Sequence, residues 1–402
     1  MSRTRSGRKG VAYVFMTFPA PSETFAAVEL QALRRRRVDI VVYTLRPPPV
    51  AWEQVMKQRG LDGITVVHGD WRTYAVGVLK CLLAPRVTLS IFKDLIAGVR
   101  LEPQQTVKGI WLLPIAIAQA ARIAQSGLSN AHLFWGHYPS LVGIALRSMA
   151  APVKVTMFLG AYDLVSRLSI SRYLARNVPV TTHAVVNCTA ISEFVGIPRN
   201  DILVIYRGIR VRDICFDLAV KKRRVVIAER LTVGKKTKDA LMVFAGALQD
   251  EHPAELVVLG DGPEMASSAA LADELGLSAR VKFRGHVPHR EVLAELSEAQ
   301  VFLSMSQKPG ERLPNAVKEA MAAGCVVVVG KSPGIEELVE DGVNGFVVPE
   351  GDTALAIDRV FQLFSDKGLM ERMAVSARAS VVNRFDVDKL TDKRLEFFGL
   401  DV

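Results

Sequence analysis

Two glutamates separated by seven residues have the types and spacing that could do chemistry in this sequence. Glu311 lies in a loop rich in Pro and Gly, and Glu319 lies on the helix expected to follow it. The first amides of a helix lack intrahelical partners and carry the positive end of the dipole, so they suit a phosphate. Here they are the amides of Asn315, Ala316 and Val317. Carboxylates flanking a diphosphate could accept hydrogen bonds from sugar hydroxyls, and the pattern therefore favours a nucleotide-sugar site.

The elements that would position these groups read as a βαβ step. Residues 301–330 form a buried strand, a polar loop, an amphipathic helix, a Gly turn and a second buried strand. The first half repeats this pattern, with strands expected at 11–15 and 39–45 and a helix over 23–37 between them. Parallel strands need such crossover connections, so the sequence predicts an α/β protein with parallel sheets.

Length and charge narrow the function classes. The 402 residues, 50% of them hydrophobic, suit two domains with a core each. Residues 1–210 hold 26 Lys and Arg against 11 Asp and Glu, whereas the net charge of the whole chain is only +10. No nucleic-acid-binding signature accompanies the basic half, so we expect no nucleic-acid partner. An anionic membrane surface fits this charge better.

The cysteines and the hydrophobic runs bear on compartment. The four cysteines, Cys81, Cys188, Cys215 and Cys325, show no CxxC or zinc spacing and indicate a reducing compartment. The basic N-terminus lacks the apolar segment of a signal peptide. The apolar run over 110–121 is shorter than the roughly 20 residues that span a bilayer. We therefore expect a cytoplasmic protein without a transmembrane helix.

A basic stripe in the first half suggests contact with a membrane. Arg86, Lys93 and Arg100 recur every seven residues, next to an apolar stripe made by Leu89, Phe92, Ile96 and Val99. This pattern is typical of a helix lying in a membrane interface. An ordinary helix packed on its sheet, with solvated basic residues, explains it equally well. Both interpretations stay open on the sequence alone.

A family resemblance covers nearly the whole chain. The stretch GERLPNAVKEAMAAGCVVVV (310–329) resembles the Glu-seven-Glu donor motif of retaining glycosyltransferase family 4, whose members have the GT-B fold. Segments within 223–352 resemble further family motifs, among them "GRL…KG", "VGDGP" and "V.F.G.V". The resemblance implies two Rossmann-like domains that face a central cleft. It also implies transfer of a sugar with retention of anomeric configuration.

The resemblance assigns donor-binding roles in the second half. Arg230 and Lys235 fall at the family's phosphate-binding positions, where two cations can hold a diphosphate, although loop cations are more often simply solvated. Gly262 lies in the "VGDGP" turn, and the backbone near Val287 would meet the base. Glu319 would bind the ribose together with the helix-start amides. Glu311 would bind the sugar and is the first catalytic candidate.

The first half matches the family less closely. The loop TFPAPSETF (17–25) resembles the family's acceptor-side loop, which makes Ser22 and Glu23 acceptor-binding candidates. His137 matches a histidine of related polysaccharide enzymes, and Asp163 matches an acidic position, so both join the catalytic candidates. A histidine following a strand is more often structural. The family's usual histidine three residues before Asp163 is replaced here by Gly160.

Departures from the family keep two alternatives open. Gly160, and Arg312 in place of a small residue, are changes that a degenerate, non-catalytic GT-B binding subunit would show. A nucleotide-sugar epimerase is the other alternative, but its acid and base groups cannot be placed. Asp386 and Asp388 spell the DxD of metal-dependent transferases, yet they lie at a helix start where Asp is a common cap. We expect no metal and no cofactor, since the nucleotide-sugar is a co-substrate.

The prediction as a whole is a retaining, hexosyltransferase-type glycosyltransferase of polysaccharide biosynthesis. Residues 1–208 form the acceptor domain, residues 209–385 the nucleotide-sugar domain, and residues 386–402 a helix that crosses back to the first domain. The acceptor would be a glycan or a lipid-linked sugar. The protein would act in the cytoplasm, peripherally at the inner face of the plasma membrane.

Overall fold

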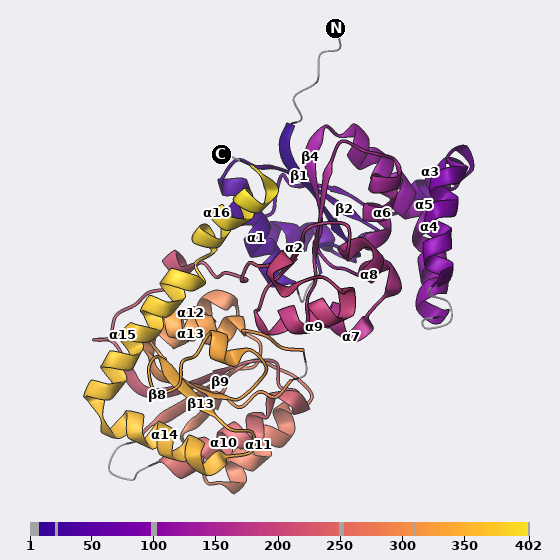
Figure 1. The fold of residues 1–402 in the computed structure, drawn as a ribbon. Helices are drawn as coiled ribbons and strands as arrows, with labels where there is room; N and C mark the ends of the chain where they lie inside the picture. Colours follow the sequence, from indigo (N-terminus) through magenta and orange to yellow (C-terminus); the bar gives the residue numbers. More distant parts are fainter. Residues whose placement is uncertain (1–7, 21–22, 98–102, 249–252, 309, 401–402) are drawn as a thin grey trace. The chain divides into compact units, whose positions relative to one another are not determined.

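The computed structural model describes residues 8–20, 23–97, 103–248, 253–308 and 310–400, which fall into two compact units (Figure 1). Unit 1 comprises residues 1–208 and 390–402, and unit 2 comprises residues 209–389. Each unit has one sheet whose paired strands all run parallel. The predicted α/β class with parallel sheets is therefore confirmed.

Unit 1 has a seven-stranded sheet in the order β3-β2-β1-β4-β5-β6-β7. Its strands are β1 (Arg8–Phe15), β2 (Asp39–Thr44), β3 (Thr65–Val67), β4 (Leu128–Leu133), β5 (Lys154–Phe158), β6 (Val180–Thr182) and β7 (Ile202–Val204). Its helices are α1 (Thr24–Arg35), α2 (Trp52–Gln58), α3 (Trp71–Leu83), α4 (Pro85–Ala97), α5 (Pro103–Gln125), α6 (Ser140–Ser148), α7 (Ala161–Ser166), α8 (Ser169–Ala175) and α9 (Val186–Val195).

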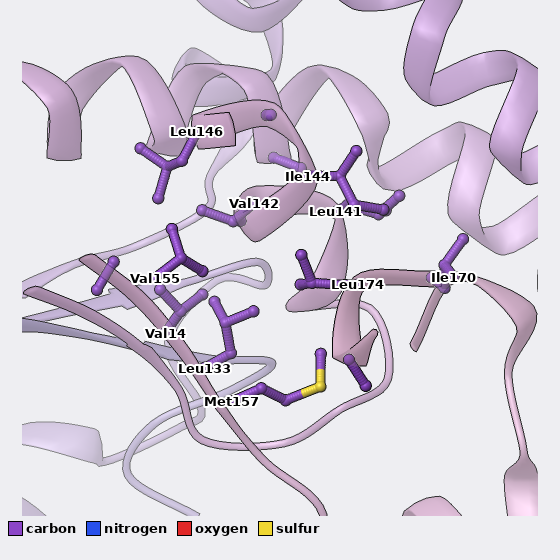
Figure 2. Close-up of a cluster of buried hydrophobic side chains, with 14 of the residues drawn as sticks. Val14, Leu133, Leu141, Val142, Ile144, Leu146, Val155, Met157, Ile170 and Leu174 are labelled. Atoms are coloured by element: carbon purple, nitrogen blue, oxygen red, sulfur yellow. The ribbon is translucent and has the colours of Figure 1, made fainter. Parts of the chain in front are cut away.

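Side-chain alternation along β1 builds the core of unit 1 on both faces of the sheet. Ala12 and Val14 join the cluster formed with α4, α5, α6, α8 and α9. Tyr13 and Phe15 point to the opposite face, toward α1, α2 and the C-terminal segment. Figure 2 shows part of the first cluster, in which side chains of α6 and α8 meet those of β1, β4 and β5. A parallel sheet covered on both faces needs this continuous apolar sequence.

The last helix, α16 (Val387–Phe398), is tied to unit 1 by buried charges. Arg394 Nη2 lies 3.0 Å from Glu29 Oε2, and each side chain is only 10% exposed. The Tyr13 hydroxyl donates to the other oxygen of Glu29 at 2.7 Å. Residues from Leu390 onward accordingly belong to unit 1, whereas the first turn of the helix belongs to unit 2.

Unit 2 has a six-stranded sheet in the order β10-β9-β8-β11-β12-β13. Its strands are β8 (Lys222–Ala228), β9 (Glu255–Leu259), β10 (Val281–Phe283), β11 (Ala299–Ser304), β12 (Val326–Gly330) and β13 (Gly345–Val348). Its helices are α10 (Thr237–Ala247), α11 (Met265–Glu274), α12 (His289–Glu298), α13 (Asn315–Ala322), α14 (Thr353–Ser365) and α15 (Lys367–Arg384). Apolar side chains of α10, α11, α14 and α15 pack on one face, where they meet Val301 and Leu303 of β11.

The predicted βαβ step is present at the centre of unit 2. Strands β11 and β12 pair in parallel from Val301 and Val326 onward, and α13 connects them. The helix starts directly after Pro314, whose extended backbone suits the residue before a first turn. Gly324 has φ +83°, and this conformation lets the chain reverse into β12. Residues with a side chain rarely adopt it, so the turn favours glycine. The loop that carries Glu311 therefore opens at the carboxyl end of β11.

The helices after β3 change the expectation about membrane spans. Helix α5 has 23 residues and is longer than the apolar run over 110–121 had suggested. It is long and apolar enough to cross a bilayer, although half of its apolar segment is buried inside the protein. Helix α3 with the start of α4 passes the same length and composition test as a pair, bent by 101°. The expectation that no helix is long and apolar enough is therefore corrected, whereas the absence of a transmembrane helix stays a prediction. Arg100 and Val99 of the predicted stripe lie outside the described residues.

Candidate functional site

The candidate site in unit 2 lies where the strand order reverses. From β8 the chain proceeds to β9 and β10 on one side of the sheet, and then returns to β11 on the other side. The loops following β8 and β11 thus leave the sheet side by side at its topological switch point, which is where open α/β sheets bind ligands. Three predicted residues, Arg230, Lys235 and Glu311, lie in these two loops.

Two glycines explain how the loop after β8 is held. The Glu229 amide donates to the Leu259 carbonyl and the Leu231 amide to the Asp261 carbonyl, so this loop runs along the turn after β9. A Cβ on Gly262 would lie 2.2 Å from the Leu231 carbonyl oxygen, and one on Gly260 would lie 1.8 Å from that of Glu229. Backbone approach alone therefore requires both glycines. The donor-binding role of Gly262 stays a prediction.

Lys235 and Glu311 meet in a half-enclosed ion pair. The Lys235 ammonium lies 2.8 Å and 2.9 Å from the two carboxylate oxygens of Glu311. The Ser306 hydroxyl donates to the same carboxylate at 2.8 Å. The side chains of Lys235 and Glu311 are 11% and 22% exposed. Residues that the sequence assigned to the diphosphate and to the sugar are thus direct partners, and a bound donor would have to share or separate them.

Glu229 is a third member of this cluster that the sequence reasoning missed. Its side chain is 3% exposed and its carboxylate lies 4.0 Å from the Lys235 ammonium. The Thr237 hydroxyl donates to it at 3.0 Å. Burial raises the pKa of Glu229 to about 7, although the nearby Lys235 acts in the opposite direction. Its position directly after a buried strand and before Arg230 was a signal that could have identified it.

Arg230 is the exposed member of the site, whereas the start of α13 is half-buried at Asn315 and Ala316 and buried at Val317. Arg230 is exposed, whereas its neighbour Glu229 is enclosed. Asn315 accepts a hydrogen bond from the Lys318 ammonium at 3.1 Å through its side-chain oxygen. The amides of Asn315, Ala316 and Val317 open the helix and remain the predicted phosphate donors.

Arg312 lies beside the sugar-binding candidate without facing its carboxylate. Its guanidinium donates to the backbone carbonyl of Glu311 at 2.9 Å. Burial lowers the pKa of Arg312, and Glu337 opposes that effect. The next residue, Leu313, is buried with φ +50°, a strained value for a branched side chain. The bend at Leu313 is what turns the loop from Glu311 into α13.

Glu319 has a partner that the sequence did not suggest. His289, the first residue of α12, has its Nε2 3.0 Å from a carboxylate oxygen of Glu319. Hydrogen bonding to Glu319 raises the pKa of His289. Glu319 is 13% exposed and His289 is 58% exposed. Val287, the base-side candidate, is half-buried two residues earlier in the same connection.

In unit 1 the acceptor-side candidates lie among aromatic rings. The strand order reverses between β1 and β4, and the Trp135 indole N–H after β4 donates to Glu23 after β1 at 2.8 Å. The Arg207 guanidinium lies 3.5 Å from the centre of the Phe25 ring. Burial raises the pKa of Glu23, and the bond from Trp135 opposes this. Ser22 lies outside the described residues.

The catalytic candidates of unit 1 are engaged in local structure. Asp163 is 2% exposed and accepts a hydrogen bond from the Gly160 amide at 2.9 Å, which caps α7. Burial raises the pKa of Asp163 to about 7 and lowers that of His137 to about 4. The His137 Nδ1 accepts from the amide of Tyr138 at 3.0 Å. These bonds give both residues a structural role, and their catalytic roles stay predictions.

Gly160, where the resemblance led us to expect a histidine, has little room for a side chain. A Cβ at this position would lie 2.9 Å from the Trp135 ring and 3.0 Å from the Phe158 ring. The two rings fill the space where a side chain would stand. Trp135 is therefore a second residue that sequence reasoning missed, and only its closeness to His137 in the chain could have suggested it.

Acidic residues elsewhere do not assemble around a metal in the part of the chain that is described. No group of three or more His, Cys, Asp or Glu side chains suited to a metal ion occurs among the described residues. Of the two residues spelling DxD, Asp386 accepts a hydrogen bond from the amide of Asp388 at 3.1 Å. This is the local capping arrangement expected at a helix start.

Comparison with known sequences concerns mainly unit 2. Residues 216–380 match the family model described as "Glycosyl transferases group 1". N-acetyl-alpha-D-glucosaminyl L-malate synthase of Bacillus anthracis is 29% identical over 227 residues, which are 54% of this chain and 57% of that protein. The lipopolysaccharide core biosynthesis glycosyltransferase LpsE of Rhizobium meliloti (strain 1021) is 33% identical over 144 residues, 36% of this chain and 41% of that protein. The chain thus matches less than two thirds of these relatives' own lengths.

Comparison with solved structures concerns the whole chain. Anabaena Alr3699/HepE in complex with UDP has a TM-score of 0.70 at 18% identity, over 97% of this chain and 99% of that one. The apo lipopolysaccharide outer core galactosyltransferase WaaB has a TM-score of 0.68 at 13% identity, over 97% and 99%. Identities this low show the fold alone. The chain has the GT-B fold of two parallel-sheet α/β domains, and its residues 216–380 are similar to the group 1 glycosyl transferases.

Proposed function

We propose that this protein transfers a sugar from a nucleotide-sugar donor to a glycan or lipid-linked acceptor, with retention of anomeric configuration. The observation that carries the proposal is the ion pair of Lys235 with Glu311 at the strand-order reversal of unit 2. It brings a cation for phosphate and a carboxylate for sugar hydroxyls to one point. A structural neighbour in complex with UDP and relatives named for polysaccharide biosynthesis support the same activity.

Each group in unit 2 has a role in this proposal. Lys235 and the exposed Arg230 hold the diphosphate, together with the first amides of α13. Glu311 accepts hydrogen bonds from the sugar hydroxyls, and Glu319 accepts them from the ribose after His289 turns away. Glu229 lies behind Lys235 and keeps its ammonium directed into the site.

The chemical step follows from the groups available. The acceptor hydroxyl oxygen forms a bond to the anomeric carbon on the face from which the nucleoside diphosphate departs. The bond between that carbon and the diphosphate oxygen breaks, and the departing phosphate takes the hydroxyl proton. Arg230 and Lys235 stabilise the negative charge that grows on the leaving group. No covalent sugar-protein intermediate is needed, and the attack from one face gives retention.

One observation favours a second candidate function. Trp135 and Phe158 close the position at Gly160 where the family places a histidine near the reacting sugar. A protein that has lost this group could bind a nucleotide-sugar without turning it over. The non-catalytic binding subunit therefore stays a distinct alternative.

Donor binding and donor consumption separate the two functions. The purified chain is first screened for thermal stabilisation by UDP- and GDP-linked sugars, because a donor that binds the folded state stabilises it by mass action. The stabilising donor is then incubated with lipid-linked and glycan acceptors, and release of nucleoside diphosphate is measured. Transfer supports the enzyme, with the anomer of the product deciding retention. Stabilisation without transfer or hydrolysis supports the binding subunit, and no stabilisation contradicts both.

A further inference from the structure

Unit 1 exposes apolar side chains on three helices that follow β3. Among the described residues, 25 large apolar side chains are exposed, and eleven of these lie between residues 71 and 111. The most exposed of these eleven lie on α3, α4 and α5. Trp71 is 75% exposed, Leu82 73%, Leu83 74%, Leu89 65% and Trp111 66%. We call this set the α3–α5 apolar surface. Figure 1 shows the three helices stacked together beside the sheet of unit 1.

Helix α3 is turned with its apolar side outward. Trp71, Val78, Leu79 and Leu82 recur at the spacing of one helix face and are all exposed. The opposite face carries the small residues Thr73 and Gly77, which are buried. A Cβ on Gly77 would lie 2.0 Å from the Pro114 carbonyl oxygen, so α3 packs against α5 by its backbone. The helix thus packs by Thr73 and Gly77 and leaves Trp71, Leu82 and Leu83 uncovered.

The charged residues on these three helices are mainly basic. Arg72, Arg86, Lys93 and Lys108 are exposed on the same three helices. The sequence of α3 contains no acidic residue, and that of α4 contains one, Asp94. Apolar side chains flanked by Lys and Arg are the composition of a segment that lies in a lipid headgroup region. Interfaces between proteins are instead depleted in Lys, which supplies half of these exposed cations.

We propose that the α3–α5 apolar surface docks onto an anionic lipid bilayer, with Trp71, Leu82, Leu83 and Trp111 entering the interface and the cations contacting lipid phosphates. The surface is broader than the stripe of Arg86 and Lys93 that the sequence suggested, because α3 supplies six of the eleven exposed apolar residues between residues 71 and 111. The inference does not depend on sugar transfer, since vesicle binding is measured without donor.

The test is cosedimentation of the full chain with phosphatidylcholine vesicles that contain or lack phosphatidylglycerol. We expect binding to the phosphatidylglycerol vesicles that weakens as salt is raised. The double variant Leu82→Gln and Leu83→Gln should lose most of this binding. The charge variant Arg86→Glu and Lys93→Glu should bind at least about tenfold more weakly than the parent. The matched control is Val375→Gln, since Val375 is an apolar residue of α15 that is 53% exposed. This variant should bind like the parent.

The competing occupant is a second copy of this chain. Size-exclusion chromatography with light scattering is run on the parent and on the Leu82 and Leu83 variant, after both show the same thermal unfolding. A dimer that the double substitution dissociates, without vesicle binding by the parent, overturns the proposal. Equal sedimentation of the parent with and without phosphatidylglycerol, or of the parent and both variants, also overturns it.

Discussion

The two units place polar groups at the same point of their sheets but use them differently. In both, loops meet where the strand order reverses, after β1 and β4 in unit 1 and after β8 and β11 in unit 2. In unit 2 these loops bring together Lys235, Glu311 and Glu229, with a cation among carboxylates. In unit 1 they bring Glu23 to the Trp135 indole, and Asp163 caps a helix. The same topology thus gives a charged cluster in one unit and an aromatic one in the other.

Under the proposed function, this difference reflects two kinds of ligand: a diphosphate that is the same in every donor, and an acceptor whose structure varies. A diphosphate presents the same charges in every donor, so cations and helix amides at fixed positions suit it. Aromatic surroundings offer shape and stacking rather than charge, which suits an acceptor made of sugar rings. Under the proposed function, unit 2 would be sensitive to loss of single charges, whereas unit 1 would be more sensitive to changes in packing.

Removal of the central cation should have the largest effect. Lys235→Met leaves the carboxylates of Glu311 and Glu229 together without a counterion, and removing one partner of an enclosed pair costs about 3 kcal/mol of unfolding free energy. Urea unfolding followed by circular dichroism measures it. The same substitution at the neighbouring Lys236 is the control. The double variant Lys235→Met and Glu311→Gln should regain part of the lost unfolding free energy. If the Lys235 variant is as stable as the Lys236 control, the central role of Lys235 is contradicted.

The two glutamates should separate binding from turnover. Glu311→Gln should lower kcat about ten- to a hundredfold, the range for a hydrogen bond to a charged group, and should not weaken nucleoside diphosphate binding, because it releases Lys235 from its ion pair. Glu319→Gln should weaken the affinity for both donor and diphosphate, because the ribose is present in both. Steady-state kinetics and calorimetry measure these effects. Unchanged turnover in the Glu311 variant contradicts the proposed mechanism.

Loss of the exposed cation should affect binding without affecting stability. Arg230→Ala should weaken nucleoside diphosphate binding by about 1.5–3 kcal/mol, since charge-assisted hydrogen bonds contribute this much. Arg230 is exposed, so the unfolding free energy should stay the same. Calorimetry with UDP and GDP measures the change, with Arg372→Ala on α15 as a control outside the site. An unaltered dissociation constant removes Arg230 from the site.

Asp163 provides the matching test in unit 1. Burial raises its pKa in the folded protein from 3.8 to about 7, so the folded state keeps a proton that the unfolded chain releases. Its stabilising contribution is complete below about pH 3.8 and is lost as pH rises toward 7. The variant Asp163→Asn keeps an acceptor for the Gly160 amide but does not titrate. Compared with this variant, the parent should lose at least about 1.4 kcal/mol of unfolding free energy between pH 3.8 and pH 7. Parallel stability profiles for parent and variant contradict a buried, protonated Asp163.

The pair of His289 with Glu319 should give the smallest effect. The bond to Glu319 raises the pKa of His289, so the pair stabilises the fold below the ordinary histidine pKa and is lost as pH rises through the raised value. Because His289 is 58% exposed, we expect less than about 1 kcal/mol. Thermal unfolding of the parent and His289→Gln should differ at mildly acidic pH and converge at alkaline pH. A difference that stays constant with pH contradicts the ion pair.

Several features were determined by the sequence itself. The alternation in β1, the apolar strands β11 and β12 and the Gly turn between them predict a parallel βαβ step, because these patterns depend on neighbours in the chain. The placement of Glu311 before α13 and of Glu319 within it follows from the same local pattern. Local patterns therefore suffice to place the two motif glutamates of unit 2 on their loop and helix.

Contacts between distant parts of the chain were decided only by the tertiary structure. Lys235 and Glu311 are 76 residues apart and meet because β8 pairs with β11, which also encloses Glu229. Trp135 reaches Glu23 across 112 residues and fills the space at Gly160. The periodicity of α3 shows that one face is apolar, but the close approach of Gly77 to α5 decides that this face points outward. Periodicity reports which residues share a face, whereas long-range packing determines what each face meets.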